Sequence, residues 1–296
     1  MAIAYPYPPG DGKVKWVSTD WLNEHLDEEK LLILDVQPNI HDYISEHIPG
    51  AVYMDEGFLR VSLRGRPGVF APKESLQIIF SRESLDPDVP VVVYTAPGSF
   101  SRCTAGMGDG LEQTMISYSL ARFGHDNVLV LDGGLQKWKA EGKEVTRVFP
   151  DKEGSNYRVQ VRDEYAVGYE EFKNIKDRDD VVLLDARPPK FYEGESPWSK
   201  PGHIPGAVNF PWRGLMDKDN PTLLKPEGEI RAVIEERNIT PDKTVICSCG
   251  TGREATNEFL LFKWRLGYPK VRLYEGSYTE WTSHPENPTV VGKNPR

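Results

Sequence analysis

Cysteine is scarce in this chain: its 296 residues include only Cys103, Cys247 and Cys249. Three cysteines are too few for the disulfide framework on which small secreted domains depend. They suit a reducing compartment, where a thiol survives as a chemical reagent. We therefore expect a cytoplasmic protein.

Long apolar runs and an excess of basic charge are also missing. No uncharged apolar run approaches the ~20 residues that span a bilayer, and Met1 to Gly12 is rich in Pro, Gly and Tyr rather than built like a signal peptide. The net charge of −9 disfavours nucleic acid or an anionic membrane as a partner. A hydrophobic content of 39 % is typical of a soluble globular protein, and the length allows two ordinary domains.

The sequence repeats itself. The string His-Ile-Pro-Gly-Ala-Val occurs at 47–52 and again at 203–208. An apolar run that ends in Asp precedes each copy, and a second apolar run, closed by Trp, follows each. The paired segments are 31–35 with 181–185, and 128–138 with 271–281. A period of about 150 residues indicates duplicated domains rather than a solenoid of short repeats.

Each copy alternates β-branched runs with amphipathic stretches. Val91 to Tyr94 and Thr244 to Ile246 read as strands, whereas 20–26 and 256–266 suit helices. Apolar strands that alternate with helices predict an α/β fold, in which a parallel sheet is flanked by helices on both faces. We expect an N-terminal domain at 1–150, a polar linker at 151–156 and a C-terminal domain at 157–296.

One glycine-rich loop stands out. Cys249, Gly250, Thr251, Gly252, Arg253 and Glu254 follow the strand at 244–248, and a helix begins near Ala255. Such a loop at a helix N-terminus points several backbone N–H groups at one spot and so favours an anion there. We expect the amides, the helix dipole and Arg253 to hold the pKa of the Cys249 thiol below its ordinary value of about 8.5.

The Cys-Gly-Thr-Gly loop, the two His-Ile-Pro-Gly-Ala strings and Asp185-Ala-Arg187 together resemble the tandem rhodanese family. That family includes thiosulfate:cyanide and 3-mercaptopyruvate sulfurtransferases. The resemblance implies two rhodanese-like domains and a catalytic C-terminal one, in which Cys249 carries sulfane sulfur as a persulfide without cofactor or metal. Thr95 occupies the nucleophile position of the N-terminal copy. Since a hydroxyl cannot carry sulfane sulfur, that domain should be inactive.

A second reading uses the other cysteine of the loop. Cys247 and Arg253 have the Cys-x5-Arg spacing of cysteine-dependent phosphatases. Against this reading, Glu254 would repel a phosphate dianion. In the rhodanese family, about eighteen residues separate the loop cysteine from a glycine at the end of the following helix. Gly267 lies at this distance from Cys249 and not from Cys247. A non-turnover module that relays sulfur or binds a partner is a further alternative, which the retention of Cys249 disfavours.

The remaining candidates have both structural and functional readings. Asp185 and Arg187 lie at the carboxyl end of a strand, where α/β sites form, and read as a structural ion pair or as a grip on substrate. His47 and His203 read as organisers of their turns. Cys247 is either a buried strand residue or a redox neighbour of Cys249. Cys103 lies in an insertion at 96–113 and should be an ordinary thiol.

The sulfur donor is the least determined feature. Thr251 could supply the hydroxyl that mercaptopyruvate enzymes carry in this loop, but their substrate arginine has no match, and only Lys190 offers a cation nearby. Lysine lacks the bidentate grip of arginine on a carboxylate. We favour thiosulfate as donor and cyanide or a thiol as acceptor. A sulfur-carrier or thioredoxin-like protein is a further candidate partner, and we expect a monomer.

Overall fold

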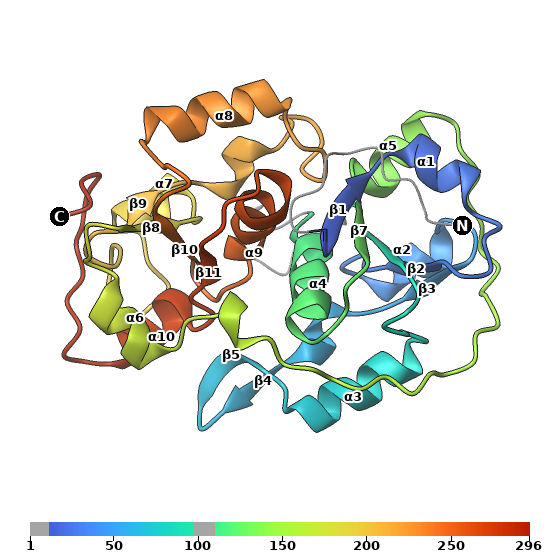
Figure 1. Ribbon diagram of the computed structural model, residues 1–296, viewed down its shortest axis with the longest axis horizontal. Helices are drawn as coiled ribbons and strands as arrows, with labels where there is room; N and C mark the ends of the chain where they lie inside the picture. Colours follow the sequence, from blue (N-terminus) through green and yellow to red (C-terminus); the bar gives the residue numbers. More distant parts are fainter. Residues whose placement is uncertain (1–11, 98–109) are drawn as a thin grey trace. The chain divides into compact units, whose positions relative to one another are not determined.

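The structure is a computed structural model that describes residues 12–97 and 110–296. Its contacts divide the chain into two compact units. Unit 1 comprises Met1–Leu59, Ala71–Arg162 and Asp217–Leu224, and unit 2 comprises Arg60–Phe70, Asp163–Met216 and Lys225–Arg296. Each unit is an α/β domain with its own sheet (Figure 1).

The sheet of unit 1 has five strands in the order β1-β7-β6-β2-β3, and all neighbours are parallel. Its strands are β1 (Val14–Val17), β2 (Leu32–Asp35), β3 (Ala51–Tyr53), β6 (Val91–Tyr94) and β7 (Val128–Leu131). The three central strands, β7, β6 and β2, are buried at every position. Strands of this kind must be covered on both faces, as the uninterrupted apolar runs predicted.

Helices cover both faces of this sheet. Trp21 of α1 (Thr19–Glu24) and Trp138 of α5 (Gly134–Ala140) share one core cluster with Ile33, Val92 and Leu129. The opposite face carries α4 (Leu111–Arg122), which contacts β6 and β7 and is buried along its whole length. The unit also contains α2 (Ile40–Ser45), the 3-10 helix η1 (Glu56–Leu59) and α3 (Lys73–Arg82).

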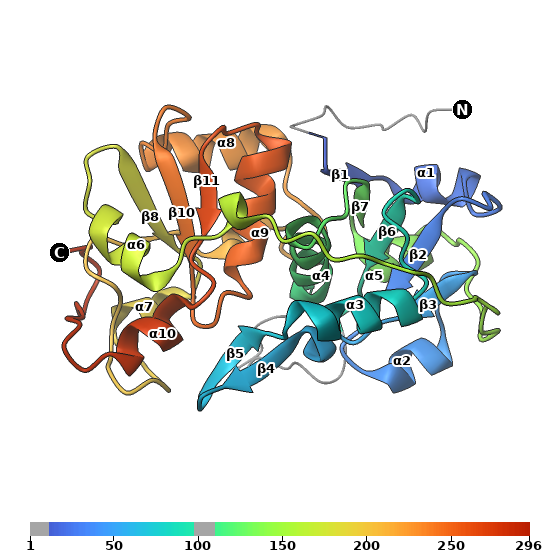
Figure 2. The ribbon, with the colours of Figure 1, turned by 60° about the horizontal axis from the view of Figure 1, so that its bottom comes forward.

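The sheet of unit 2 has four parallel strands in the order β11-β10-β8-β9. The strands are β8 (Val181–Asp185), β9 (Val208–Asn209), β10 (Thr244–Ser248) and β11 (Val271–Leu273); the arrows of β8, β10 and β11 lie side by side in Figure 2. This order repeats β7-β6-β2-β3 of unit 1. The duplicated sequence therefore folds into two copies of one sheet.

Helices again cover both faces. Phe172 of α6 (Tyr169–Ile175), Tyr192 of α7 (Pro189–Glu193) and Trp281 of α10 (Ser277–Ser283) share one core cluster. α9 (Ala255–Leu260) contacts β10 and β11 and continues into a π-helical turn, η4 (Leu261–Arg265). The other helices are α8 (Glu227–Glu236) and the 3-10 helices η2 (Asp163–Tyr165) and η3 (Trp212–Leu215).

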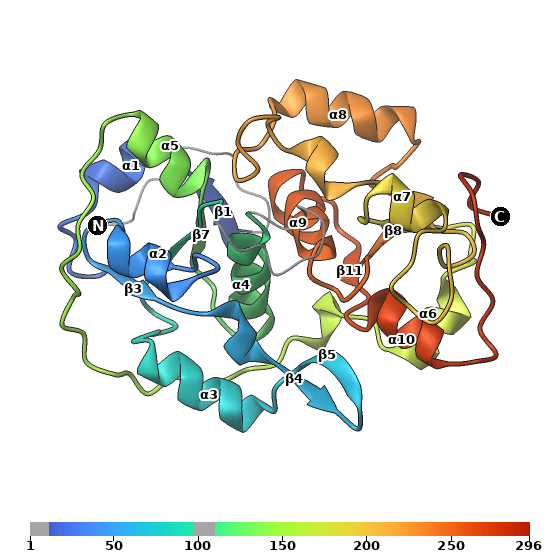
Figure 3. The ribbon, with the colours of Figure 1, turned by 180° about the vertical axis from the view of Figure 1, so that it is seen from behind.

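Two short segments belong to the unit opposite to their place in the sequence. An antiparallel hairpin of β4 (Arg60–Leu63) and β5 (Arg66–Phe70) is part of unit 2, where β5 contacts α10 (Figure 3). Asp217–Leu224 in turn is part of unit 1. These segments begin 13 residues after His47 and 14 residues after His203, so they are equivalent positions of the repeat.

The observed boundaries differ from the expected 1–150 and 157–296 for a physical reason. Residues 157–162 pack with unit 1: the Tyr157 ring contacts Phe80, and the Gln160 and Arg162 amides donate to carbonyls at 123 and 122. The polar composition of 151–156 marks an exposed stretch, but the change of unit follows Arg162.

No helix in the described ranges combines the length and the apolar character that crossing a membrane requires.

Candidate active site

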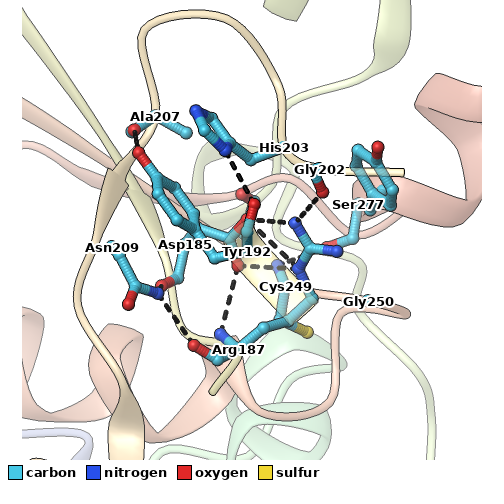
Figure 4. Close-up of polar contacts among 12 residues, drawn as sticks. Asp185, Arg187, Tyr192, Gly202, His203, Ala207, Asn209, Cys249, Gly250 and Ser277 are labelled. Carbon is cyan, nitrogen blue, oxygen red and sulfur yellow. Dashed lines mark hydrogen bonds and ion pairs between the residues drawn. The ribbon is translucent and has the colours of Figure 1, made fainter. Parts of the chain in front are cut away.

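Cys249 lies directly after β10, at the carboxyl end of the sheet of unit 2. The start of α10 fixes the loop backbone around it. The Cys249 N–H donates to Ser277 Oγ at 3.1 Å (Figure 4). The Tyr278 and Thr279 amides donate to the Cys249 and Gly250 carbonyls at 3.0 and 2.9 Å. The loop is therefore attached to a second helix besides the one that follows it.

Neither loop glycine, Gly250 or Gly252, leaves room for a side chain. Gly252 has a φ of +79°, and a Cβ there would lie 2.5 Å from the Glu275 carbonyl oxygen. Its N–H donates to Cys249 Sγ at 3.1 Å. A Cβ on Gly250 would lie 2.5 Å from the Trp198 ring. The expected close approach of backbone to sulfur is present.

The expected lowering of the Cys249 pKa was wrong in sign. The side chain is 1 % exposed, and burial together with the Glu254 carboxyl raises the pKa of the thiol. The Thr251 and Ala255 amides lower it but offset only part of this rise. The loop does present donors to the sulfur, as the sequence indicated, but it also excludes water and places a carboxyl against it.

Glu254 is buried within hydrogen-bonding reach of the Cys249 thiol. Its Oε2 also accepts a long hydrogen bond, 3.5 Å, from the Gly250 amide. Burial raises the pKa of this carboxyl. Arg253 is buried as well, at 5 % exposure, and its cationic charge favours the ionised form of Glu254.

Sequence reasoning missed a further residue at this loop, Arg60 of the β4–β5 hairpin. Its guanidinium donates to the Thr251 carbonyl, and its Nε donates to the Gly68 carbonyl at 2.9 Å. The only available signal was the position of Arg60, shortly after the first His-Ile-Pro-Gly-Ala string. No local pattern connects that position with residue 251.

Asp185 and Arg187 form a buried, two-pronged ion pair (Figure 4). Arg187 Nε lies 2.9 Å from Asp185 Oδ1, and Nη2 lies 2.6 Å from Oδ2. Nη2 also donates to the Gly202 carbonyl, and the guanidinium lies 4.2 Å from the centre of the Tyr278 ring. Arg187 is 0 % exposed. This geometry favours the structural reading of the pair; a grip on substrate stays a prediction.

Cys247 is a fully buried residue of β10, in register with Leu184 of β8 and Leu273 of β11. Burial and the nearby Glu258 raise its pKa well above the ordinary value. This environment suits the reading of Cys247 as a buried strand residue. Its role as a redox neighbour remains a hypothesis.

Thr95 occupies in unit 1 the place that Cys249 occupies in unit 2, directly after β6. Its hydroxyl donates to the Val36 carbonyl and to Glu112 Oε2, each at 3.3 Å. The segment 217–224 packs against the same place: Thr222 accepts from the Gly133 amide at 3.0 Å. In unit 1, the position equivalent to Cys249 therefore carries a hydroxyl in place of a thiol, and the segment 217–224 packs against it.

His47 and His203 organise their turns, as expected. His47 Nδ1 lies 2.8 Å from the Tyr43 carbonyl, and its ring stacks on Tyr43. His203 Nδ1 lies 2.8 Å from the Tyr192 carbonyl, and its ring stacks on Tyr192.

Cys103 and residues 98–109 of the insertion lie outside the described residues, whereas 111–113 form the start of α4. In the described part of the chain, no group of three or more His, Cys, Asp or Glu residues could hold a metal ion.

Relatives identify this arrangement. The family model of the rhodanese-like domain matches residues 18–141 and 169–284. A protein of Synechococcus elongatus, provisionally named a thiosulfate sulfurtransferase, is 34 % identical over 91 % of this chain and 83 % of its own length. The sulfur carrier protein TtuD of Thermus thermophilus is 32 % identical, over 90 % and 92 %. The 3-mercaptopyruvate sulfurtransferase of Escherichia coli is 28 % identical, over 92 % and 96 %.

Solved structures share the fold. An anaerobic ergothioneine biosynthesis enzyme from Chlorobium limicola, solved with trimethyl histidine, superposes with a TM-score of 0.82 at 23 % identity. The match covers 94 % of this chain and 70 % of that one. Two matched domains, repeated sheets and relatives of nearly equal length lead to one conclusion: the chain belongs to the rhodanese family and is a two-domain sulfurtransferase.

Proposed function

We propose that this protein transfers sulfane sulfur from thiosulfate to a thiophilic acceptor, such as cyanide or a thiol, through a persulfide on Cys249. One observation carries the proposal: Cys249 Sγ sits within a ring of loop amides at the start of α9, with the Gly252 N–H 3.1 Å away. Amide dipoles that point at one spot stabilise a sulfur anion as it forms.

The reaction is a double displacement. The Cys249 sulfur attacks the outer sulfur of thiosulfate, a new S–S bond forms, and the donor's S–S bond breaks with its electron pair on the departing sulfite. The acceptor then attacks the outer sulfur of the persulfide. The electron pair of that bond returns to Cys249, which is ready for the next cycle.

The surroundings of Lys190 support thiosulfate over 3-mercaptopyruvate. Lys190 follows Asp185-Ala-Arg187 in the segment where mercaptopyruvate enzymes carry an extra arginine, and it lies 3.3 Å from Glu195 and over the Phe191 ring. A lysine engaged in this way offers a carboxylate no two-pronged grip. Mercaptopyruvate is the second candidate donor, favoured by the hydroxyl of Thr251 and by the relative of that name.

The acceptor could also be a protein. The relative named as a sulfur carrier supports delivery of the persulfide sulfur to a carrier or thioredoxin-like protein in place of a small molecule. A cytoplasmic location and a monomeric state complete the proposal; both follow from the sequence.

Intact-protein mass after treatment with thiosulfate tests the proposal. Wild type should gain the mass of one sulfur atom, Cys247→Ser should gain it too, and Cys249→Ser should gain none. Addition of cyanide should remove the extra mass and release thiocyanate. A wild type that gains no sulfur from thiosulfate or mercaptopyruvate but hydrolyses an aryl phosphate would contradict the proposal.

A further inference from the structure

The buried thiol poses a chemical problem. Cys249 must lose a proton before it attacks, but it is 1 % exposed and its pKa is raised, so direct transfer of that proton to bulk water is unfavourable. A proton acceptor close to the sulfur would resolve the problem. None of the described histidines is among the groups that perturb the Cys249 thiol, whereas Glu254 is.

We propose that Glu254 is a catalytic proton relay, which accepts the Cys249 proton during attack on the donor and passes it to the leaving group. The inference rests on the proposed function and assigns a role to a carboxyl that the sequence marked only as a loop residue. Its basis is position: Glu254 hydrogen-bonds to the reacting sulfur atom and is itself buried.

Local structure keeps Glu254 in this position. It directly precedes α9, with helical backbone angles, and its Oε2 receives the Gly250 amide of the same loop. The carboxyl and the thiol therefore belong to one short loop of six residues, Cys249 to Glu254. A group held in this way reaches the proton without a conformational change.

The charges around Glu254 suit a group that exchanges a proton. Asp185 raises its pKa and Arg253 lowers it, while burial raises it further. Asp185 is paired with Arg187, which also faces Glu254. One turn along α9, Glu258 is fully buried, and burial raises its pKa well above the ordinary value. A carboxyl with a raised pKa is a better proton acceptor near neutral pH than an exposed one.

The proton balance closes with no further reactant. The thiol proton moves to the Glu254 carboxylate as the Cys249 sulfur bonds to the outer sulfur of thiosulfate. The donor's S–S bond breaks with its electron pair on sulfite, and the Glu254 carboxyl then protonates the departing sulfite. The products are the persulfide anion, bisulfite and the original carboxylate.

Glu258 supplies a matched control. It lies on the same helix, is buried to the same degree and carries a carboxyl, yet both of its oxygens lack a hydrogen-bond partner among the described residues. The test compares wild type, Glu254→Gln and Glu258→Gln. Two rates are measured, that of persulfide formation with thiosulfate and that of alkylation of Cys249 by iodoacetamide. Both are followed over about four pH units around neutrality, from roughly pH 5 to 9.

The relay predicts a larger loss in persulfide formation than in alkylation for Glu254→Gln. Persulfide formation at neutral pH should fall about a hundredfold, the usual size of a lost acid–base group, and should rise about tenfold per pH unit because only hydroxide then ionises the thiol. The wild-type rate should level off once Glu254 is ionised. Alkylation should also fall, because attack on iodoacetamide needs the ionised thiol too, but it should fall less than persulfide formation, because iodide leaves without a proton. Glu258→Gln should match wild type in both reactions.

Three results would overturn the relay. Persulfide formation by Glu254→Gln that equals or exceeds the wild-type rate would leave the carboxylate only a repulsive role. An equal loss in both reactions would mean that Glu254 passes no proton to the leaving group, and an equal loss in Glu258→Gln would indicate structural damage from loss of a buried carboxyl. If wild type itself takes no sulfur from thiosulfate or mercaptopyruvate, the proposed function fails together with the relay; if wild type does and Glu254→Gln is unaffected, only the relay fails.

Discussion

Arg60 donates a hydrogen bond to the carbonyl of Thr251, a residue 191 positions further along the chain. Arg60 comes from the half of the sequence that lacks a nucleophile, and Thr251 lies in the loop that holds Cys249. The first repeat therefore supplies part of the structure around Cys249, the proposed nucleophile. This contact holds the middle of the loop, where the amides face sulfur.

The Arg60 contact should matter for catalysis. A hydrogen bond from a charged donor contributes about 1.5–3 kcal/mol, so Arg60→Ala should lower kcat/KM for sulfur transfer at least about tenfold. Steady-state release of thiocyanate from thiosulfate and cyanide measures the effect. Arg64→Ala, an exposed arginine on the same hairpin, is the control and should retain wild-type kinetics. Equal kinetics of the two variants would mean that the loop keeps its shape without Arg60.

A cysteine placed in the second repeat should stay inert. Thr95→Cys in a Cys249→Ser background restores a thiol at the equivalent position, but Glu112, Gly134 and Thr222 surround that position closely. We expect these neighbours to leave too little room for an added sulfur atom. Intact mass after thiosulfate treatment should show no gain. A gain of one sulfur would indicate that the missing nucleophile alone had silenced unit 1.

The loop glycine at 252 should not tolerate a side chain. Gly252→Ala combines a left-handed φ of +79° with a Cβ 2.5 Å from the Glu275 carbonyl oxygen, and the left-handed conformation alone costs about 1–2 kcal/mol. We expect a loss of both thermal stability and persulfide formation. Gly228→Ala is the counterpart, since Gly228 lies in α8 with open space around it. The free energy of unfolding of that variant should rise by roughly 0.5–1 kcal/mol. Calorimetry and mass spectrometry measure the two effects.

His125 should make unit 1 sensitive to acid. The ring is fully buried, its Nδ1 has no hydrogen-bond partner among the described residues, and burial lowers its pKa to about 4. Because the folded-state pKa lies below the unfolded value of about 6.5, its contribution is complete above pH 6.5 and is lost as the pH falls towards 4. The loss is on the order of 3 kcal/mol.

The pH dependence is isolated by comparison with His125→Gln. Asp35 opposes His125 in the same range, since burial raises its pKa to about 6 and its contribution is lost as the pH rises. Taking the difference in free energy of unfolding between wild type and variant removes Asp35 and all other common groups. That difference should shrink between pH 6.5 and 4. A constant difference would mean that the ring is already protonated, or is reached by water, in the folded protein.

Local and repeated patterns were enough for much of this protein. The apolar runs predicted the buried parallel strands, the repeated strings predicted two copies of one domain, and the strand, glycines and helix around residues 244–255 located the loop. These features depend on periodicity and on near neighbours in the chain, which the sequence displays directly. The sequence by itself thus determined the family, the duplication and the position of the loop that contains Cys249.

The tertiary structure decided what depends on enclosure and on distant segments. The sign of the Cys249 pKa shift follows from the exclusion of water and from the Glu254 carboxyl at the sulfur, and neither is visible in the spacing of residues. The hairpin at 60–70 and the segment at 217–224 each pack with the other repeat, which no local pattern records. Burial and long-range contacts are set only when the whole chain has folded, and they control how reactive the loop cysteine is.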